Sequence, residues 1–506
     1  MSVPPQQHPG TLPGVLQAAA KRYGDKAAYV EDDRTLSFTE LLEQVRAVAR
    51  GYVALGLEPG GRVVLWAPNS IDWVVAGLAV SYAGGTLVPA NSRYTGHEVG
   101  DIVDRTDASL VLVADGFLGR TQIVDLQGAS DLASVLEVVD LAGLAWVSQL
   151  GDDSLAGEVE ARADAVLSDD VADILFTSGT TGRPKGAMSA HRQTIGVADA
   201  WSSLGGVTAE DRYLVVNPFF HSFGYKIGIV VGLVTGATLY PVASFDPKHT
   251  MQLIQDARIT VLPGAPTIYQ SLLTAPNRAE YDLSPLRLAV TGAAVVPVVL
   301  IERMRAPAPE GLGIDNVLTA FGMTEAVVAT MCRDGDSAEL VAKTCGRAIP
   351  GMEARIGELD ELLLRGEYVM LGYLDDPKAT REAVDADGWL HTGDVGTLDE
   401  AGNLTITDRL KDMYISGGFN VYPAEVEQAL MRLAGVNDVA VVGVPDERMG
   451  EVGKAYVVRG NEALSKDDVI AFARERLANF KVPREVEFIG VLPRNLGGKV
   501  LKTELR

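Results

Sequence analysis

The chain has 506 residues, which is too long for a single hydrophobic core and predicts at least two domains. Hydrophobic residues make up 47% and charged residues 22%, as in ordinary globular proteins, and the net charge of −23 argues against nucleic acid as the main partner. The two cysteines give no disulfide framework, and the six histidines lack the paired spacing of a metal site.

The N-terminal part of the chain alternates between strand-like and helix-like segments. It opens with MSVPPQQHPG, which lacks the charged and apolar regions of a signal peptide, so we expect a cytoplasmic protein. Thr11 is a plausible cap for a first helix, and the capping box Ser37–Glu40 begins a second. The apolar run 62–66 predicts a buried strand, and similar runs recur as far as Ile174. This alternation predicts an α/β fold with largely parallel sheets.

A glycine-rich loop, TSGTTGRPKG, occupies Thr177–Gly186 directly after an apolar strand end. Glycines let backbone N–H groups approach an anion, hydroxyl groups can donate to phosphate oxygens, and Lys185 adds a positive charge. The order differs from a Walker A motif, because Lys185 precedes a glycine and no hydroxyl residue follows it. The alternative is a surface turn without a ligand. The candidate phosphate-binding residues are Thr177, Ser178, Gly179, Thr180, Thr181, Gly182 and Lys185.

An aromatic segment, Asn217–Lys226, contains His221 and four aromatic residues. This composition indicates either a pocket wall or a core strand with a hydrogen-bonded histidine, and the residue chemistry alone favours the core strand. The apolar stretch Ile227–Ala243 that follows is broken by Gly, Thr and Pro and is shorter than the ~20 residues that span a bilayer. We therefore expect no transmembrane segment.

Three later apolar runs are predicted as strands that end in small residues, at 261–267, 288–294 and 319–325, and the first of them runs into a Gly/Pro turn. Ligands of open α/β sheets bind outside the carboxyl ends of the strands. These ends, with one aromatic residue, are plausible walls for a flat purine, although each alone also fits an ordinary turn between a strand and a helix.

The C-terminal part of the chain is predicted to form a separate small domain. Asp394 follows a glycine, which is the usual setting of a turn residue. The charged run Asp408–Asp412 fits a solvated turn, and the apolar pattern restarts after it, so we place the boundary near Lys411. Residues 435–506 predict a compact α+β domain. Near its end, Lys499 follows two glycines and is either a specific site residue or an ordinary exposed lysine.

The glycine-rich loop and the later motifs resemble those of the adenylate-forming superfamily, which comprises acyl-CoA synthetases, luciferases and peptide-synthetase adenylation domains. The resemblance runs from about residue 11 to Arg506. It implies a large adenylation domain at 1–410, a small mobile α+β domain at 411–506, the substrates ATP and coenzyme A, and the ion Mg²⁺. It also implies a reaction in which a carboxylic acid forms an acyl-adenylate and then a thioester.

The resemblance also implies a role for individual residues. For the nucleotide it implies Gly292, Ala293 and Ala294 beside adenine, Ala320, Phe321 and Gly322 with the aromatic on the base, and Asp394 and Arg409 on the ribose or phosphate. For the reaction it implies Thr324 at the α-phosphate, Glu325 at Mg²⁺, His221 between the acyl pocket and the nucleotide, and Lys499 as the adenylation lysine. It further implies a hinge at Lys411 and a pantetheine tunnel beside Gly417 and Gly418.

The acid substrate is indicated by a narrower resemblance. Segments 217–226, 244–273 and 408–427 are similar to actinobacterial synthetases of steroid breakdown, which activate the indanedione propanoate HIP left from the C and D rings. Fatty-acid and aryl-acid synthetases share every catalytic motif and are the alternative. A nucleotide-binding protein without ligase activity and a luciferase-like oxygenase are further alternatives. We expect the acid and coenzyme A as partners, with a homodimer as the assembly to test.

Overall fold

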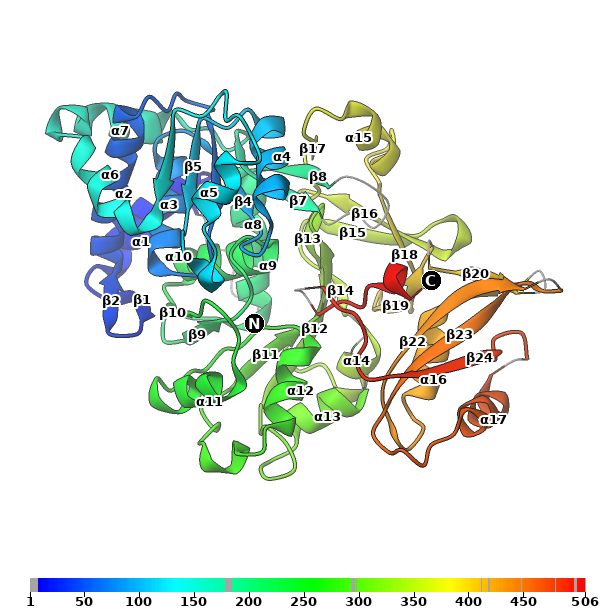
Figure 1. Cartoon of the computed structure of the whole chain (residues 1–506). Coiled ribbons are helices and arrows are strands. Elements are labelled where there is room, and N and C mark those ends of the chain that lie inside the picture. The colour runs from blue at the N-terminus through cyan, green and yellow to red at the C-terminus, as the bar shows by residue number, and fades with distance from the viewer. Residues whose placement is uncertain are drawn as a thin grey trace.

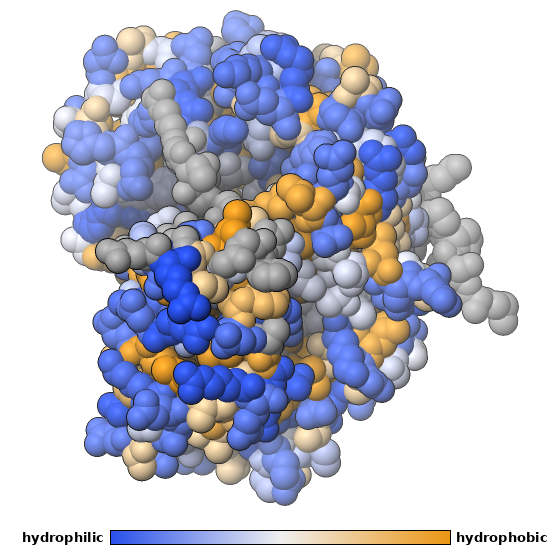
Figure 2. All heavy atoms as spheres, turned by 90° about the vertical axis from the view of Figure 1, so that its right-hand side faces the viewer, coloured by the Kyte–Doolittle hydropathy of each residue, from blue (hydrophilic) through white to orange (hydrophobic). Residues whose placement is uncertain are grey.

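The structure is a computed structural model in which a large N-terminal body adjoins a smaller C-terminal lobe, coloured orange to red in Figure 1. It describes residues 8–177, 184–292, 296, 298–410, 412–416, 419–446, 448–477, 479–495 and 498–505, with the backbone alone at 408, 409, 419, 420 and 450. Figure 2 shows the face that carries the lobe, which is mostly hydrophilic with hydrophobic residues gathered near its middle.

A seven-stranded sheet is the centre of the N-terminal body, in the order β17-β8-β7-β4-β3-β5-β6. The strands from β7 to β6 run parallel, whereas β8 and β17 are antiparallel additions at one edge. Their bounds are β3 Arg62–Trp66, β4 Thr86–Ala90, β5 Leu110–Val113, β6 Glu137–Asp140, β7 Val171–Thr177, β8 Lys185–Ala190 and β17 Gly372–Tyr373.

Strand β3 shows why the central strands of this sheet appear as continuous apolar runs in the sequence. Val63 and Leu65 pack into one hydrophobic cluster, and Val64 and Trp66 pack into another on the opposite face. Alternate residues of a strand point to opposite faces, so a sheet that is covered on both sides needs apolar residues at every position. Helices therefore cover both faces, as the strand–helix alternation predicts.

Two four-stranded sheets also belong to the N-terminal body, β2-β1-β10-β9 and β11-β12-β13-β14. Single bridges at Val261, to Tyr213 and Leu288, link β9 to β11. The bounds are β1 Ala27–Glu31, β2 Arg34–Ser37, β9 Arg212–Val215, β10 Thr238–Pro241, β11 Leu288–Thr291, β12 Asn316–Met323, β13 Ala326–Met331 and β14 Arg347–Ala348.

An antiparallel sheet, β15-β16-β18-β19, precedes the lobe and is not predicted by the strand–helix alternation. Its bounds are β15 Met352–Ile356, β16 Glu361–Gly366, β18 Leu390–Leu398 and β19 Leu404–Arg409. The lobe has its own sheet, β21-β20-β23-β22 with β24 beside β23. These strands are β20 Tyr414–Ser416, β21 Phe419–Val421, β22 Val436–Asp446, β23 Gly450–Arg459 and β24 Glu485–Ile489.

Several of the helices begin where the sequence provides caps. The Thr11 side chain accepts from the Gly14 N–H group, and the Ser37–Glu40 capping box is present, as expected. The α-helices are α1 Leu12–Tyr23, α2 Phe38–Ala54, α3 Ile71–Tyr82, α4 Gly96–Thr106, α5 Gln122–Gln127, α6 Leu144–Leu150, α7 Ala156–Ala165, α8 His191–Gly205, α9 Ser222–Gly224, α10 Val231–Thr235, α11 Pro247–Asp256, α12 Pro266–Thr274, α13 Val298–Arg305, α14 Ala338–Lys343, α15 Pro377–Ala383, α16 Pro423–Leu430 and α17 Lys466–Arg476. The segment η4, Tyr225–Val230, is a π-helix.

Three of the expected strands differ in the structure. In the stretch 261–267, which is predicted as a strand that runs into a Gly/Pro turn, Val261 and Gly264 form single bridges and α12 begins at Pro266. No ladder forms, because Pro263 lacks the N–H group that a ladder needs. Strand β12 ends at Met323, so residues 324–325 form a turn. The aromatic segment is not a core strand, because the short helix α9 and the π-helix η4 occupy it from Ser222 onwards.

Candidate functional site

The glycine-rich loop connects two antiparallel strands, β7 and β8, and the residues that flank it face each other. Thr177 is paired with Lys185 across the hairpin. The Arg105 guanidinium packs 5.0 Å from the centre of the Phe176 ring and donates to the Pro184 carbonyl at 2.6 Å, so it holds both limbs together. The candidates Ser178, Gly179, Thr180, Thr181 and Gly182 lie outside the described residues.

Tyr373 connects the loop lysine to the candidate metal ligand. The Lys185 ammonium lies 4.9 Å from the centre of the Tyr373 ring, and the Tyr373 hydroxyl donates to Glu325 Oε1 at 2.7 Å. Burial first, and then the Glu325 charge, raise the pKa of Tyr373 above its ordinary value. Sequence reasoning missed Tyr373, because nothing local marks it: only the pairing of β17 with β8 brings it to the site.

The turn between β12 and β13 presents two further candidates. Met323 and Ala326 are paired across the hairpin, so Thr324 and Glu325 form its two-residue turn. Glu325 is buried and its carbonyl accepts from the Met370 N–H group at 2.8 Å. A side chain at Gly322 would collide with the Val327 carbonyl, which explains the glycine beside this turn.

The ends of β11 and β12, which are predicted as walls for a purine, lie side by side. The two strands are parallel, with Thr291 opposite Thr319, so Gly292 and Ala320 are the next pair of positions. A Cβ atom at Gly292 would lie 2.4 Å from the Ala320 carbonyl oxygen in this packing, which excludes any larger residue. Ala320, Phe321 and Gly322 are half-buried, and Ala293 and Ala294 lie outside the described residues.

His221 lies in a segment that is tied to the neighbouring strand ends. The Asn217 side chain donates to the Pro263 carbonyl at 3.0 Å. The His221 Nδ1 atom accepts from the Phe223 N–H group at 3.2 Å, which fixes the ring at the start of α9. The ring is solvent-accessible, yet protein surrounds it closely enough for burial to lower its pKa.

Asp394 and Arg409 lie on consecutive strands and are brought together by strand pairing. They face each other across β18 and β19. Asp394 is 3% exposed, and its N–H group donates to the Thr392 hydroxyl at 3.0 Å. The side chain of Arg409 lies outside the described part of the chain.

Lys499 lies on a tight turn that touches the N-terminal body. Its N–H group donates to Asn495 Oδ1 at 2.9 Å, and Arg494 forms an ion pair of 2.6 Å with Asp438 on β22. Gly498 has φ of +78°, and a Cβ atom on it would lie 3.0 Å from the Thr267 hydroxyl at the start of α12. The red C-terminal segment accordingly lies where the two parts meet (Figure 1). The candidates Lys411, Gly417 and Gly418 lie outside the described residues.

Two family models match the chain: the AMP-binding enzyme at residues 16–374 and the AMP-binding enzyme C-terminal domain at residues 425–499. The chain belongs to the adenylate-forming superfamily. It is 55% identical to an acyl-CoA ligase of Rhodococcus jostii over 99% of both chains, and 54% identical to one of Mycobacterium tuberculosis over 98% of both. Both relatives are named for 3-(7a-methyl-1,5-dioxo-octahydro-1H-inden-4-yl)propanoyl-CoA.

The folds of solved members of the superfamily match the whole of this acyl-CoA ligase. ATP-bound MatB from Rhodopseudomonas palustris is 30% identical, with a TM-score of 0.86 over 98% of both chains. Apo MatB has a TM-score of 0.78 over 99% of this chain. The expected α/β fold, with a large N-terminal part and a smaller C-terminal part, is therefore confirmed.

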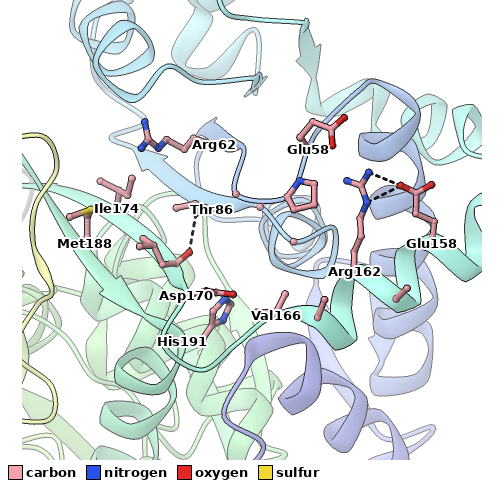
Figure 3. Close-up of a pocket in the computed structure, with 17 residues that line it drawn as sticks. Glu58, Arg62, Thr86, Glu158, Arg162, Val166, Asp170, Ile174, Met188 and His191 are labelled. Carbon is pink, nitrogen blue, oxygen red and sulfur yellow. Dashed lines mark hydrogen bonds and ion pairs between the residues drawn. The ribbon is translucent and has the colours of Figure 1, made fainter.

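A cavity of about 640 Å³ in the adenylate-forming fold lies away from the candidate residues (Figure 3). Arg62, Thr86 and Val171 line it, and each is the first residue of its strand. Ligands of parallel sheets bind at the carboxyl ends, where β7 leads into the glycine-rich loop. We therefore do not assign the nucleotide to this cavity.

The described side chains of this ligase include no group of three or more His, Cys, Asp or Glu residues that could hold a metal ion. Glu325 is thus a single carboxylate, with one oxygen held by Tyr373. Among the described residues, none of the helices is both long and apolar enough to cross a membrane.

Proposed function

We propose that this ligase converts HIP, the bicyclic dione acid left from the steroid C and D rings, into its coenzyme A thioester. The observation that carries the proposal is the 55% identity, over 99% of both chains, to the R. jostii ligase named for that thioester. Small residues support it locally, since Gly264 and Ala265 adjoin the His221 segment through the contact of Asn217 with Pro263. A bulky bicyclic acid needs a wide pocket, and small residues in the pocket wall leave room for it.

In the first half-reaction we assign to the cations of the site the task of bringing two anions together, the carboxylate of the acid and the α-phosphate of ATP. The carboxylate attacks the α-phosphorus of ATP and pyrophosphate leaves, so catalysis depends on positioning and on positive charge near the reacting oxygens. Lys499 is assigned to the carboxylate and α-phosphate, and Thr324 donates to the same phosphate. The loop Thr177–Lys185 holds the β- and γ-phosphates as they depart.

The remaining candidates are assigned to the nucleoside. The strand ends at Gly292 and Ala320 are too close for larger residues, which supports a narrow slot for adenine with Phe321 on the base. Asp394, next to Arg409 across β18 and β19, is assigned to the ribose hydroxyls. Ala293, Ala294 and Gly322 complete the proposed purine walls.

We include Mg²⁺ in the proposal, since this ion neutralises charge on phosphate oxygens. Mg²⁺ takes one or two carboxylates together with phosphate oxygens, and Glu325 offers one carboxylate at the turn after β12. Tyr373 orients that carboxylate by donating to Oε1 at 2.7 Å.

In the second half-reaction the coenzyme A thiol attacks the acyl carbonyl and AMP leaves. Rotation of the domain that follows Lys411 would withdraw Lys499 and bring Gly417 and Gly418 beside the pantetheine chain. The contact between Gly498 and Thr267 supports the view that the described arrangement belongs to the first half-reaction.

The assembly and location belong to the same proposal. We propose a homodimer, to be checked by light scattering of the purified enzyme. We propose a cytoplasmic location, because ATP and coenzyme A are supplied there.

The substrate proposal is tested by turnover of HIP, octanoate and benzoate side by side, with release of AMP and pyrophosphate as the readout. We expect kcat/KM for HIP to exceed the other two by at least about 100-fold, because a site shaped for a large rigid acid gains its binding energy there. Negligible turnover of HIP beside good turnover of octanoate or benzoate would reject the steroid acid and keep the ligase.

A further inference from the structure

A buried ion pair joins β7 to the π-helix η4 and has no role in the reaction described above. The Lys226 ammonium lies 3.0 Å from Asp173 Oδ1, and the side chains are 2% and 0% exposed. Lys226 also donates to the Ser189 hydroxyl at 2.7 Å, and the Thr194 hydroxyl donates to Asp173 Oδ2 at 2.7 Å. We refer to Lys226, Asp173, Ser189 and Thr194 as the buried quartet.

The quartet joins the two parts of the site that must hold different substrates. Asp173 is on β7 and Ser189 is on β8, which are the two limbs of the hairpin that carries the glycine-rich loop. Lys226 is the second residue of the π-helix η4 and the last residue of the aromatic segment that contains His221. The His221 carbonyl accepts from the Tyr225 N–H group at 2.9 Å, so the neighbour of Lys226 is bonded to the candidate pocket wall.

Stability alone is a poor reason for this arrangement. Two charges lose their hydration when they are buried, and well-packed apolar residues of similar volume usually stabilise a core equally well. An ion pair with two added hydrogen bonds differs from apolar packing because it is directional and fixes the relative placement of the elements that it joins. The π-helical turn at this point is also a rare conformation that is found frequently at functional sites.

We propose that Lys226 is a positioning residue: through the buried quartet it fixes the His221 wall of the acyl pocket relative to the hairpin that holds the triphosphate. The acid and the α-phosphate then meet at the required distance. This inference rests on the proposed ligase function, and it adds a specific role for four residues that contact neither substrate.

The test compares Lys226→Met, Asp173→Asn and the double variant with the wild-type enzyme. Each single variant leaves one uncompensated buried charge, so we expect a lower melting temperature for both. The double variant removes both charges while the introduced asparagine keeps an acceptor for Thr194, so its melting temperature should return toward the wild-type value. We nevertheless expect its KM for the acid to stay about tenfold or more above wild type, with KM for ATP within about twofold.

A matched control is available at the other end of the strands. Asp211 is buried and paired with Arg287, and these residues precede β9 and β11 at their amino ends, away from the loop. The double variant Asp211→Asn/Arg287→Met should change the melting temperature without changing KM for either substrate. A double variant of Lys226 and Asp173 that recovers both its melting temperature and its KM for the acid would overturn the positioning role.

Two further arms cover the remaining outcomes. If the double variant does not fold, Ser189→Ala removes one acceptor of Lys226 and should still raise KM for the acid, and a normal KM overturns the proposal. Affinity for a non-reactive acyl-sulfamoyl adenosine, which spans both parts of the site, is measured by calorimetry without turnover. Variants that bind it as tightly as wild type overturn the quartet's role, whereas a wild-type enzyme that turns over no acid overturns the ligase proposal instead.

Discussion

Tyr373 is the residue at which three separate parts of the chain meet. It carries the Lys185 ammonium over its ring, donates its hydroxyl to Glu325 and pairs with β8 through its backbone. A carboxylate that is to hold a magnesium ion benefits from a donor on one oxygen, since the donor fixes which oxygen faces the ion. The sequence marks Lys185 and Glu325 through their motifs, whereas Tyr373 is 48 residues from Glu325 and belongs to neither motif.

Replacing Tyr373 with Phe should therefore weaken the metal-dependent step and leave the fold intact. We expect carboxylate-dependent exchange of pyrophosphate into ATP to fall about 10- to 100-fold, with a higher Mg²⁺ concentration needed for half-maximal rate. Tyr368→Phe is the control, because the Tyr368 ring packs at Gly196 and Gly351 rather than at Glu325. An unchanged Mg²⁺ dependence in Tyr373→Phe would remove this role.

The buried side chain of His191 predicts how the free energy of unfolding depends on pH. Its Nδ1 atom accepts from the Leu12 N–H group at 3.2 Å in the buried region, and burial lowers the pKa of His191 from 6.5 to about 4, against the opposing charges of Asp173 and Asp170. Between about pH 4 and pH 6.5, the unfolded chain therefore binds a proton at His191 and the folded chain does not. The stabilisation is complete above pH 6.5 and is lost as the pH falls toward 4.

We expect the free energy of unfolding to fall by about 3 kcal/mol over this window through His191 alone. Denaturant titrations at pH 7.5, 6, 5 and 4.5 on wild type and His191→Gln measure it, because glutamine retains an acceptor but does not titrate. Parallel pH dependences of the two proteins would show that another group is responsible.

At the scale of elements, the turn that carries Lys499 is shaped by contacts from both parts of the molecule. Asn495 accepts from the Lys499 N–H group, and Arg494 is anchored to β22 through Asp438. Gly498 lies close to Thr267 at the start of α12, since a Cβ atom on it would be 3.0 Å from the Thr267 hydroxyl. Gly498 has a positive φ of +78°, which glycine adopts without strain. The turn is therefore a rigid unit that fits the N-terminal body at one place.

Gly498→Ala should slow adenylation for two separable reasons, backbone strain and a collision with Thr267. We expect the double variant Gly498→Ala/Thr267→Ala to recover part of the pyrophosphate exchange, since it removes the atoms 3.0 and 3.5 Å from the new Cβ but not the strain. Thioesterification of a supplied acyl-adenylate should stay near wild type in both variants. A double variant as slow as the single one would mean that Thr267 does not contact this turn during the reaction.

Across the whole molecule, the proposed division of labour follows from the placement of Lys499 on the C-terminal lobe, for which we propose a rotation between the two half-reactions. Lys499→Ala should lose at least about 100-fold of the adenylation rate, because it removes the cation aimed at the reacting anions. The same variant should still form the thioester from a supplied acyl-adenylate. Gly418→Leu should show the opposite pattern by narrowing the pantetheine tunnel. Equal loss of both half-reactions in Lys499→Ala would refute the assignment.

The sequence by itself determined what depends on neighbouring residues. The capping box at Ser37–Glu40, the two-sided apolar run of β3 and the strand ends at β7 and β11 were all predicted, because caps and periodicity act within a few residues. The glycine-rich loop stands out by its own composition, whereas Glu325, Asp394 and Lys499 were named through the resemblance to the adenylate-forming superfamily. The strand expected at Val261 is reduced to single bridges, because Pro263 lacks the N–H group that a ladder needs.

The tertiary structure alone decided which distant residues touch. The contacts of Tyr373 with Glu325, Gly498 with Thr267 and Lys226 with Asp173 join segments that no local pattern relates. Their geometry follows from strand order and from the docking of the C-terminal lobe on the N-terminal body, which minimise free energy over the whole chain rather than over a window of it.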